Sequence, residues 1–316
     1  MPAVRQLDDG GWLLPAPAKI NLFLHVIGRR GDGRHLLQTA FRMIDLADEI
    51  KLHPRADGRI ERSAGMADLP PEQDLAVRAA LALRAATGCR IGATIAVRKR
   101  IPAGGGLGGG SSDAATVLLG LNRLWQLHLS RETLMEIGLS LGADVPFFIY
   151  GRSAFAEGIG EVLREIELPP AEYLLVMPGI SVATGEIFSA PELTRNTAEI
   201  TVASFSEAMF LAASGNDRTQ DTLGFGRNDL EPVAACRYPK VRAALDWLAA
   251  KSNANGNANW RSGRMSGSGA SCVAQLIAGA DIQLSELPAG MKALAASGID
   301  IHPLIGWASS IPESQE

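Results

Sequence analysis

Apolar residues alternate with other residues along the first part of the chain, which is the period of a β-strand. Residues 11–27 indicate an antiparallel strand pair or an extended region, and the turn residues Gly28 to Gly33 indicate a loop. A further strand is expected within 36–53. A third alternating stretch, at 93–99, runs directly into a series of glycines.

Apolar residues three and four positions apart indicate helices in the first half of the chain. Residues 74–87 show this spacing, with Asp74 near the expected N-terminus. Residues 114–127 and 131–142 show it as well. Ser111-Ser112-Asp113 precedes the first of these two helices, and we expect one of the serines to cap it.

The second half mixes the two patterns. Strand-like segments lie at 147–156 and 173–177, and Pro169-Pro170 between them indicates a domain boundary. The remaining expectations are helices over 227–250 and 286–297, strands near 271–277 and 300–304, and a mobile polar loop at 251–264. Because strands and helices do not alternate regularly, we predict the α+β class.

The chain has 316 residues, more than one hydrophobic core usually organises. We therefore expect two domains that share a cleft, covering residues 1–168 and 169–316. Apolar residues make up 47% and charged residues 20% of the chain, which is typical of a soluble globular protein.

Charge and cysteine content narrow the range of functions. The formal net charge is −4 and no basic run occurs, so we do not expect a nucleic-acid partner. Cys89, Cys236 and Cys272 are far apart, which favours reduced cytosolic thiols over disulfides or a zinc site. We expect neither a secretory signal nor a membrane span, and a cytoplasmic location.

The most informative segment is the glycine loop, defined here as residues 102–110. Six of the seven residues from Gly104 to Gly110 are glycine, and each glycine would weaken a regular strand or helix by roughly 0.5–1 kcal/mol. Such a loop before a helix N-terminus presents backbone N–H groups that suit a triphosphate. A flexible linker would need neither the preceding strand nor the following helix.

Two other nucleotide-binding motifs do not fit this loop. Gly104, Gly106 and Gly109 satisfy G-x-G-x-x-G, but a Rossmann motif needs a second strand ending in an acidic residue about 20 residues on, where this sequence predicts a helix. A Walker A loop ends in Gly-Lys-Ser/Thr, whereas this loop ends in Gly110-Ser111-Ser112.

Three segments together resemble the GHMP kinase superfamily of galacto-, homoserine, mevalonate and phosphomevalonate kinases. They are PAKINL (17–22), the glycine loop with SSDAA (111–115), and SGSGAS (266–271). The resemblance covers nearly the whole chain. It implies a two-domain GHMP kinase fold, with an N-terminal domain like domain 2 of ribosomal protein S5 and a ferredoxin-like C-terminal domain. ATP and substrate would bind between the two.

The finer pattern is similar to the branch of the superfamily that acts on a cytidine diphosphate-linked methylerythritol. Segments 17–35, 101–125, 141–161 and 191–197 carry this similarity. It implies an enzyme that transfers the γ-phosphoryl group of ATP to a hydroxyl, with Mg²⁺, as a monomer or homodimer. A mevalonate or homoserine kinase and a catalytically silent nucleotide-binding protein remain as alternatives.

The resemblance also assigns catalytic roles. It makes Asp144 the general base that accepts the proton of the substrate hydroxyl, although its residue type also fits a turn at a helix end. It places Lys19 beside Asp144, where its charge would keep the carboxylate ionised, although a lysine in an apolar strand usually extends to the surface. Asn21, two residues on, would share its face of the strand.

Two sets of ligand-binding residues follow from the same resemblance. The residues expected at ATP are Lys99, Pro102, Ala103, Gly104, Gly105, Gly106, Leu107, Gly108, Gly109, Gly110, Ser111 and Ser112. Those expected at the substrate are Asn21, Arg34, His35, Thr184, Phe188, Gly267 and Gly269. The pattern identifies no ligand for magnesium with certainty, although a hydroxyl of Ser111 or Ser112 is a candidate.

One position departs from the family pattern. Relatives usually have Asp-Gly-Tyr-His where this chain has Asp32-Gly33-Arg34-His35. In the family the tyrosine stacks on cytosine, a phenylalanine matching Phe188 covers its other face, and the histidine contacts the base edge. A guanidinium is planar and can lie over a ring, so we expect Arg34 to stack in place of tyrosine.

Overall fold

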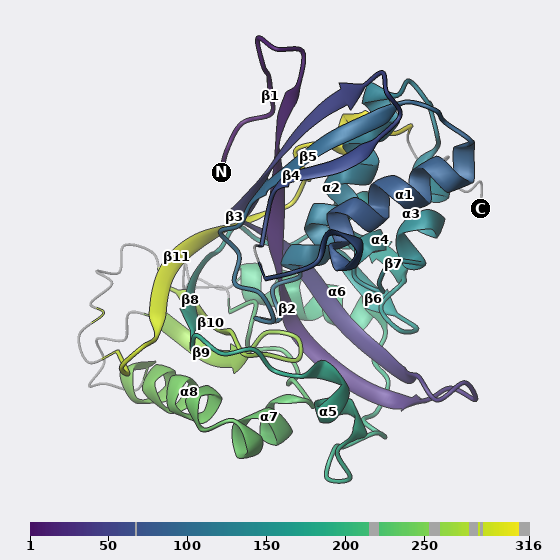
Figure 1. Cartoon of the computed structure of the whole chain (residues 1–316). Helices are drawn as coiled ribbons and strands as arrows, with labels where there is room; N and C mark the ends of the chain where they lie inside the picture. The colour runs from purple at the N-terminus through teal and green to yellow at the C-terminus, as the bar shows by residue number, and fades with distance from the viewer. Residues whose placement is uncertain (67, 215–220, 253–259, 278–283, 285–286, 310–316) are drawn as a thin grey trace.

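The computed structural model describes residues 1–316 except 67, 215–220, 253–259, 278–283, 285–286 and 310–316 (Figure 1). In the described part, one mixed sheet runs through the molecule in the order β1-β2-β3-β11-β8-β10-β9, with β4–β7 attached to its first half. The first-half strands are β1 (Arg5–Gln6), β2 (Trp12–Arg29), β3 (His35–Arg55), β4 (Ile60–Ala64), β5 (Gly92–Arg98), β6 (Ala154–Glu157) and β7 (Val162–Glu165). The second-half strands are β8 (Glu172–Met177), β9 (Trp260–Met265), β10 (Cys272–Leu276) and β11 (Lys292–Ile299).

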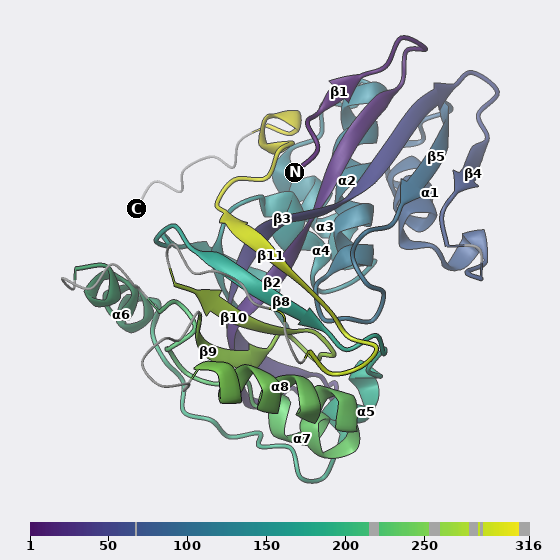
Figure 2. The ribbon, with the colours of Figure 1, turned by 90° about the vertical axis from the view of Figure 1, so that its left-hand side faces the viewer.

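Helices cover this sheet in two groups (Figures 1 and 2). The first group is α1 (Leu75–Thr87), α2 (Gly109–Leu124), α3 (Arg131–Leu139) and α4 (Val145–Tyr150), with a short 3-10 turn at Pro71–Gln73. The second group is α5 (Thr184–Ser189), α7 (Glu231–Arg237) and α8 (Pro239–Ser252), and a second 3-10 turn lies at Ile305–Trp307. Helix α6 (Val202–Ser214) lies apart from both groups (Figure 2), with Phe205 and Met209 in a third core. None of the helices within the described residues is long and apolar enough to cross a membrane.

The long β2–β3 hairpin is the scaffold of the first half. It pairs from Trp12↔Leu52 to Arg29↔His35 with three register shifts, and helices α1–α4 bury its apolar face in one continuous core. The alternation therefore predicted extended structure correctly, but residues 11–27 hold one strand and not a pair, and this strand continues to Arg29, past the expected start of the loop at Gly28. The predictions for α1, β5, α3 and β8 are confirmed as well, with ends that differ by one to three residues.

Strand β11 connects the two halves of the sheet. It pairs with β3 through Gly298↔Ile44 and with β8 along six residue pairs. Beyond β8 the sheet continues through β10 and β9, and α7 and α8 pack with these strands in a second core. All strand pairs are antiparallel except β4–β5, which agrees with the α+β expectation of mixed helices and sheet.

The strand expected over 147–156 is wrong for its first part. Residues Val145–Tyr150 form α4, and only Ala154–Glu157 form a strand. Short apolar runs do not distinguish a buried strand from a buried helix by periodicity. The residues at the two ends of the segment do distinguish them here, because Pro146 lies in the first turn of the helix and Gly151 ends it at φ 78°.

Two predictions near the C-terminus are also wrong. The helix expected over 286–297 is a strand in its described part, since β11 begins at Lys292. Its long pairing with β8 overrides the helical propensity of its alanines. The strand expected near 300–304 is not formed, apart from a single bridge between Ile301 and Arg152.

Three further differences concern the second half. The helix expected over 227–250 is two helices, because Tyr238 adopts an extended conformation between α7 and α8. Of the loop expected over 251–264, residues 253–259 lie outside the described part, and 260–264 belong to β9. Strand β10 matches the expectation near 271–277, whereas α5 and α6 were not expected.

Candidate active site

A cavity of about 650 Å³ lies where the centre of β2, the glycine loop, the start of α4 and the second glycine-rich segment meet. Most of the residues that the sequence singled out line it. They are Lys19, Asn21, Lys99, Pro102, Ala103, Gly104, Gly105, Gly106, Leu107, Gly108, Gly109, Gly110, Ser111, Asp144, Thr184, Phe188, Gly267 and Gly269. Ser112, Arg34 and His35 are not among the lining residues.

The glycine loop connects β5 to α2, and its backbone requires glycine at specific positions. Gly104, Gly106 and Gly108 have φ values of 65°, 73° and 71°, a region that other residues rarely adopt. The lack of space for a side chain is a second reason why the loop requires glycine. A Cβ on Gly106 would lie 2.2 Å from the carbonyl oxygen of Ser266, so no side chain fits there.

Helix α2 begins at Gly109, five residues earlier than expected, with Gly108 as its N-cap. No side chain caps it, so the prediction that Ser111 or Ser112 is the cap is wrong. The physical reason is that both serines lie inside the first turn, where a side chain can no longer act as N-cap. Ser111 lines the cavity, whereas Ser112 is fully buried and its hydroxyl has no partner in the described structure.

Lys19, Asn21 and Asp144 form a hydrogen-bonded group at the base of the cavity. Lys19 is 3% exposed, so it does not extend to the surface. Its Nζ donates to Asn21 Oδ1 at 2.6 Å and lies 3.5 Å from Asp144 Oδ2. Asn21 Nδ2 in turn donates to Thr39 Oγ1 at 2.9 Å, which fixes the orientation of the amide.

Asp144 differs from its lysine partner in exposure. Its side chain is 36% exposed, and it faces the cavity. Although Asp144 is the residue before α4, its side chain makes no capping hydrogen bond. The carboxylate is therefore held by one buried cation and open on the other side, which is the arrangement a proton acceptor for a bound alcohol needs.

The second glycine-rich segment, Ser266–Ser271, closes against both the glycine loop and β2. Ser266 Oγ accepts from the Asn21 backbone N–H at 3.2 Å, and Ser271 N–H donates to the Gly105 carbonyl at 3.0 Å. A Cβ on Gly267 would lie 3.2 Å from Asn21 Oδ1. The left-handed φ of 56° at Gly267 thus lets the backbone approach the group formed by Lys19, Asn21 and Asp144.

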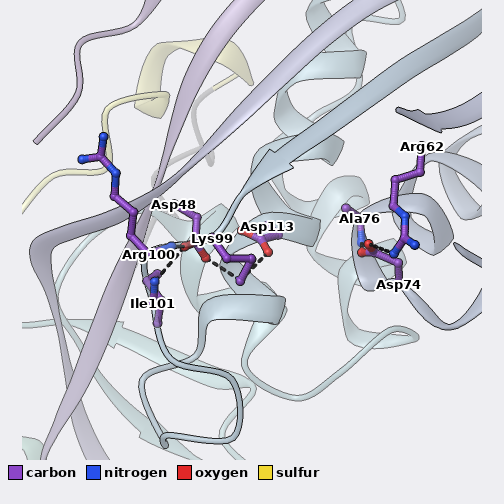
Figure 3. Close-up of polar contacts among 8 residues, drawn as sticks. All are labelled: Asp48, Arg62, Asp74, Ala76, Lys99, Arg100, Ile101 and Asp113. Carbon is purple, nitrogen blue, oxygen red and sulfur yellow. Dashed lines mark hydrogen bonds and ion pairs between the residues drawn. The ribbon is translucent and has the colours of Figure 1, made fainter. Parts of the chain in front are cut away.

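Lys99 occupies a position between two carboxylates (Figure 3). Its Nζ donates to Asp48 Oδ2 at 2.5 Å and to Asp113 Oδ2 at 2.7 Å. Burial alone would lower the pKa of Lys99, but the charges of Asp113 and Asp48 hold it above its ordinary value. Lys99 lines the cavity as expected, but its ammonium is already engaged.

The residues expected at the cytosine group partly come together. The rings of His35 and Phe188 lie 5.0 Å apart with an interplanar angle of 32°. His35 Nε2 accepts from Arg195 Nε at 3.1 Å, and burial together with the Arg195 and Arg29 charges lowers the pKa of His35. Arg34 is exposed, and its N–H donates to Asp32 Oδ1 at 3.0 Å.

Sequence reasoning did not identify two parts of the site. One is Arg195, which also donates to the carbonyls of Phe188, Ala190 and Leu193; the segment 191–197 that contains it was quoted only as a resemblance. The other is an apolar end of the cavity. It is lined by Met66, Leu69, Leu75 and Val97, and no local pattern in a loop before a helix could have indicated it.

Metal ligands were left open by the sequence. Among the described residues, no three histidine, cysteine, aspartate or glutamate side chains cluster as a protein metal site. Mg²⁺ usually binds through one or two protein ligands together with substrate phosphates and water. The Ser111 hydroxyl and the Asp144 carboxylate both face the cavity and suit such a sparse set.

Comparison with known proteins defines the class first. The model of the GHMP kinases N terminal domain matches residues 74–152, the segment that carries the glycine loop and α1–α4. A homoserine kinase from Cytophaga hutchinsonii shares the fold with a TM-score of 0.62 at 16% identity, covering 94% of this chain and 97% of that one. The molecule is a GHMP kinase.

Closer relatives define the family. A 4-diphosphocytidyl-2-C-methyl-D-erythritol kinase of Aromatoleum aromaticum is 50% identical over 93% of this chain and 95% of its own. The one of Nitrosospira multiformis is 49% identical over 93% of each. A crystal structure of a 4-(cytidine 5'-diphospho)-2C-methyl-D-erythritol kinase is 34% identical with a TM-score of 0.71, covering 90% of this chain and 98% of that one. The chain belongs to the family of 4-diphosphocytidyl-2-C-methyl-D-erythritol kinases.

Proposed function

We propose that this kinase transfers the γ-phosphoryl group of ATP to the 2-hydroxyl of 4-diphosphocytidyl-2-C-methyl-D-erythritol, giving the 2-phosphate. The reaction belongs to the non-mevalonate (MEP/DXP) pathway to isopentenyl diphosphate. One observation carries the proposal: the Lys19–Asp144 pair and the glycine loop line one cavity in a chain about half identical to enzymes of that name.

The nucleotide is assigned to the glycine-loop side of the cavity. The N–H groups of the loop and the uncapped first turn of α2 suit the phosphates, because a helix N-terminus carries unpaired donors and a positive dipole end. The apolar end at Met66, Leu69, Leu75 and Val97 suits the base. Lys99 lies beside the loop, but its ammonium would not be free to pair with a phosphate, because Asp48 and Asp113 already hold it.

Asp144 is assigned the role of general base. The substrate hydroxyl would donate its proton to the exposed side of the carboxylate as its oxygen attacks the γ-phosphorus in line. Lys19, buried and 3.5 Å away, favours the ionised form of Asp144 and lies where negative charge develops. Ser111 and Asp144 would hold Mg²⁺, which would neutralise charge on the phosphates when bound.

The substrate is assigned to the opposite side, between β2 and α5. His35 and Phe188 already form an aromatic pair that can contact a pyrimidine. Arg34 is exposed at the start of β3, and we propose that its guanidinium covers the base in the complex. Thr184, whose hydroxyl lies 2.7 Å from Ser268 Oγ, and the backbone at Gly267 and Gly269 suit the diphosphate and polyol.

Several broader assignments belong to the same proposal. We divide the chain at residues 168 and 169. The first half is then like domain 2 of ribosomal protein S5. The second, with β11-β8-β10-β9 antiparallel and α7 and α8 packed with them, is ferredoxin-like. We further propose a cytoplasmic enzyme, monomeric or homodimeric, with no nucleic-acid partner.

Parallel assays with three alcohols test the function. The purified protein is offered ATP and Mg²⁺ with the cytidylylated methylerythritol, mevalonate or homoserine, and ADP release is followed. We expect turnover with the first alone. Turnover with mevalonate or homoserine would replace the substrate assignment, and ATP binding without turnover on any alcohol would indicate a catalytically silent protein.

A further inference from the structure

Asp48 is a fully buried carboxylate at the start of the glycine loop. It lies on β3, and its Oδ1 accepts from two consecutive backbone N–H groups, Arg100 at 2.5 Å and Ile101 at 2.8 Å. Its Oδ2 accepts from Lys99 Nζ at 2.5 Å. One side chain therefore holds the last three residues before the loop begins (Figure 3).

The end of the loop is tied to the same group. Asp113 lies in the first turns of α2, four residues after its first residue Gly109, and is 4% exposed. Its Oδ2 accepts from Lys99 Nζ at 2.7 Å. Lys99 thus connects Asp48, at the entry to the loop, with Asp113, at its exit, and the three side chains form what we term the loop clamp.

The two parts of the loop differ in packing: Leu107 is buried in a core with residues of β2 and β3, whereas the part from Pro102 to Gly105 is more open. Pro102, Ala103 and Gly105 line the main cavity on one side and a second cavity of about 570 Å³ on the other. Its remaining support comes from backbone contacts with other segments. Ser271 N–H donates to Gly105 at 3.0 Å, and the Lys19 N–H donates to Leu107 at 3.0 Å.

Because the part from Pro102 to Gly105 borders a cavity on each side, side-chain packing contributes less to its shape than it does at Leu107. More of its shape comes from the bonds at the ends of the loop and from the few backbone contacts along it. Preorganised backbone donors bind an anion better than mobile ones, since less conformational entropy is lost on binding. The clamp is therefore in a position to affect nucleotide affinity without touching the nucleotide.

The clamp contains two aspartates and one lysine, so Lys99 has a second partner when one aspartate is removed. Replacing either aspartate by asparagine leaves the Lys99 ammonium paired with the other one. Both asparagine variants should therefore fold, which makes the clamp accessible to mutation.

We propose that Asp48 is a positioning residue for nucleotide binding, which fixes the entry of the glycine loop directly and, through Lys99 and Asp113, fixes its distance from α2. The proposal rests on the proposed function in one respect, namely that this loop holds the phosphates of ATP.

The test compares Asp48→Ala, Asp48→Asn and a matched control. Asp48→Ala removes all three hydrogen bonds. Asp48→Asn keeps an oxygen that can accept from Arg100 and Ile101 and loses the charge and the hydrogen bond opposite Lys99. The control is Asp45→Asn, also on β3, whose carboxylate accepts from the Ser297 N–H at 2.8 Å and which is remote from the loop.

Two measurements are made on each full-length variant. Titration calorimetry gives Kd for ATP and for the cytidylylated substrate, and amide hydrogen exchange without nucleotide gives the protection of residues 102–110. We expect Asp48→Ala to raise Kd for ATP at least tenfold, to leave that for the substrate within twofold, and to lose protection in the loop. Asp48→Asn should retain most of the ATP affinity and most of the loop protection, and Asp45→Asn should match the wild type in both.

Unchanged ATP affinity and loop protection in a folded Asp48→Ala protein would overturn the proposal, as would equal losses for ATP and the substrate. If Asp48→Ala does not fold, the Asp113→Asn variant replaces it, and unchanged ATP affinity and loop protection there would overturn the part played by Asp113. If wild-type protein does not bind ATP, the proposed function fails. The exchange measurement without nucleotide would still show whether Asp48 orders the glycine loop.

Discussion

Lys19 and Asp144 show how the environment of a side chain changes what it can do. A lysine buried to this extent is costly unless paired, and Lys19 has two partners, Asn21 at 2.6 Å and Asp144 at 3.5 Å. It also lies 5.0 Å from the ring centre of Phe41. Because a surface lysine would need none of these contacts, its burial supports a role in the chemistry of the cavity.

Replacing Asp144 by asparagine keeps its volume and a hydrogen-bond acceptor for Lys19 but removes the base. We expect kcat to fall roughly 10²-fold or more, in the range of general-base contributions, with Kd for ATP nearly unchanged. Steady-state kinetics and calorimetry measure both. Asp246→Asn, an exposed aspartate of α8, is the control for charge loss. Near-normal turnover by the Asp144 variant would exclude Asp144 from the mechanism.

Arg34 is the residue whose predicted role depends most on the bound state. It is exposed and does not line the cavity, whereas His35 and Phe188 already contact each other. Since stacking on a base contributes on the order of 1–3 kcal/mol, Arg34→Ala should raise KM for the cytidylylated substrate about tenfold and leave KM for ATP unchanged. Arg34→Tyr should be tolerated.

Arg30→Ala is the matched control for Arg34, because Arg30 lies in the same loop and pairs with Asp32 and Glu161. It removes a nearby positive charge without touching the predicted stacking position. An unchanged KM in Arg34→Ala would show that His35 and Phe188 hold the base without it. Equal rises in both variants would point to loop charge instead of stacking.

The residues that sequence could identify are those close together in the chain or carried by a recognisable motif. Lys19 and Asn21 are two apart on one strand, so their common face followed from strand geometry. Arg195 contacts His35 from 160 positions away, and Asp48 and Asp113, which share Lys99, lie on different elements. Partners that are distant in sequence leave no periodic signal, which is why neither contact was predicted.

Strands and helices were predictable where the pattern was long. The β2–β3 hairpin and α1 show many repeats of their period. The six-residue α4 is too short to show one, and β11 is a strand because β8 and β3 flank it. At α2 the helical pattern was right, but its start depended on the left-handed φ of 71° at Gly108, which a run of glycines does not localise.

The first turns of α2 carry a group whose protonation should affect stability. Burial raises the pKa of the Asp113 carboxyl to about 8, the Asp48 charge adds to this, and Lys99 opposes it. The unfolded chain loses this proton near pH 4, so between about pH 4 and pH 8 the folded state binds more protons than the unfolded one. This group's contribution is therefore complete below pH 4 and is lost as the pH rises towards 8.

Asp113→Asn should remove this dependence. The stability of the variant relative to wild type should increase between about pH 4 and pH 8, by at most about 1.4 kcal/mol per pH unit for one proton. Urea unfolding of both proteins at several pH values measures the difference. A difference that is constant with pH, or that falls as the pH rises, would show that Asp113 does not retain a proton in the folded protein.

A shared sheet joins the two halves of the molecule, and the buried side chain of Arg42 adds to this connection. Arg42, on β3, is fully buried. Its Nη1 donates to the Pro169 carbonyl at 2.6 Å and to the Tyr173 hydroxyl at 3.3 Å, and its Nη2 lies 3.3 Å from Asp300. These partners all belong to the segment after residue 168, so Arg42 connects β3 to the second half beside β11.

The backbone of β11 lies close to the side chain of Arg42. A Cβ on Gly298 would lie 2.1 Å from Arg42 Nε, so this glycine of β11 allows the guanidinium to pass. The sequence indicated neither Arg42 nor Gly298, because a single arginine in a strand looks like a surface charge. The sequence predicted a boundary at Pro169-Pro170, but it did not indicate the buried hydrogen bonds from Arg42 to Pro169 and Tyr173.

Replacing Arg42 by methionine keeps most of the volume and removes the donors. The Pro169 carbonyl and the Tyr173 hydroxyl lose this donor, at about 1–3 kcal/mol for each buried group left unsatisfied. Tyr173 retains a contact with Thr222 Oγ1 at 2.9 Å, and Asp300 is 53% exposed and can be hydrated. We therefore expect the free energy of unfolding to fall by about 2–3 kcal/mol, measured by urea denaturation. Arg152→Met, which breaks an exposed pair with Glu165, should cost less than about 1 kcal/mol. If the two variants were equally stable, Arg42 would not contribute to the connection between the halves.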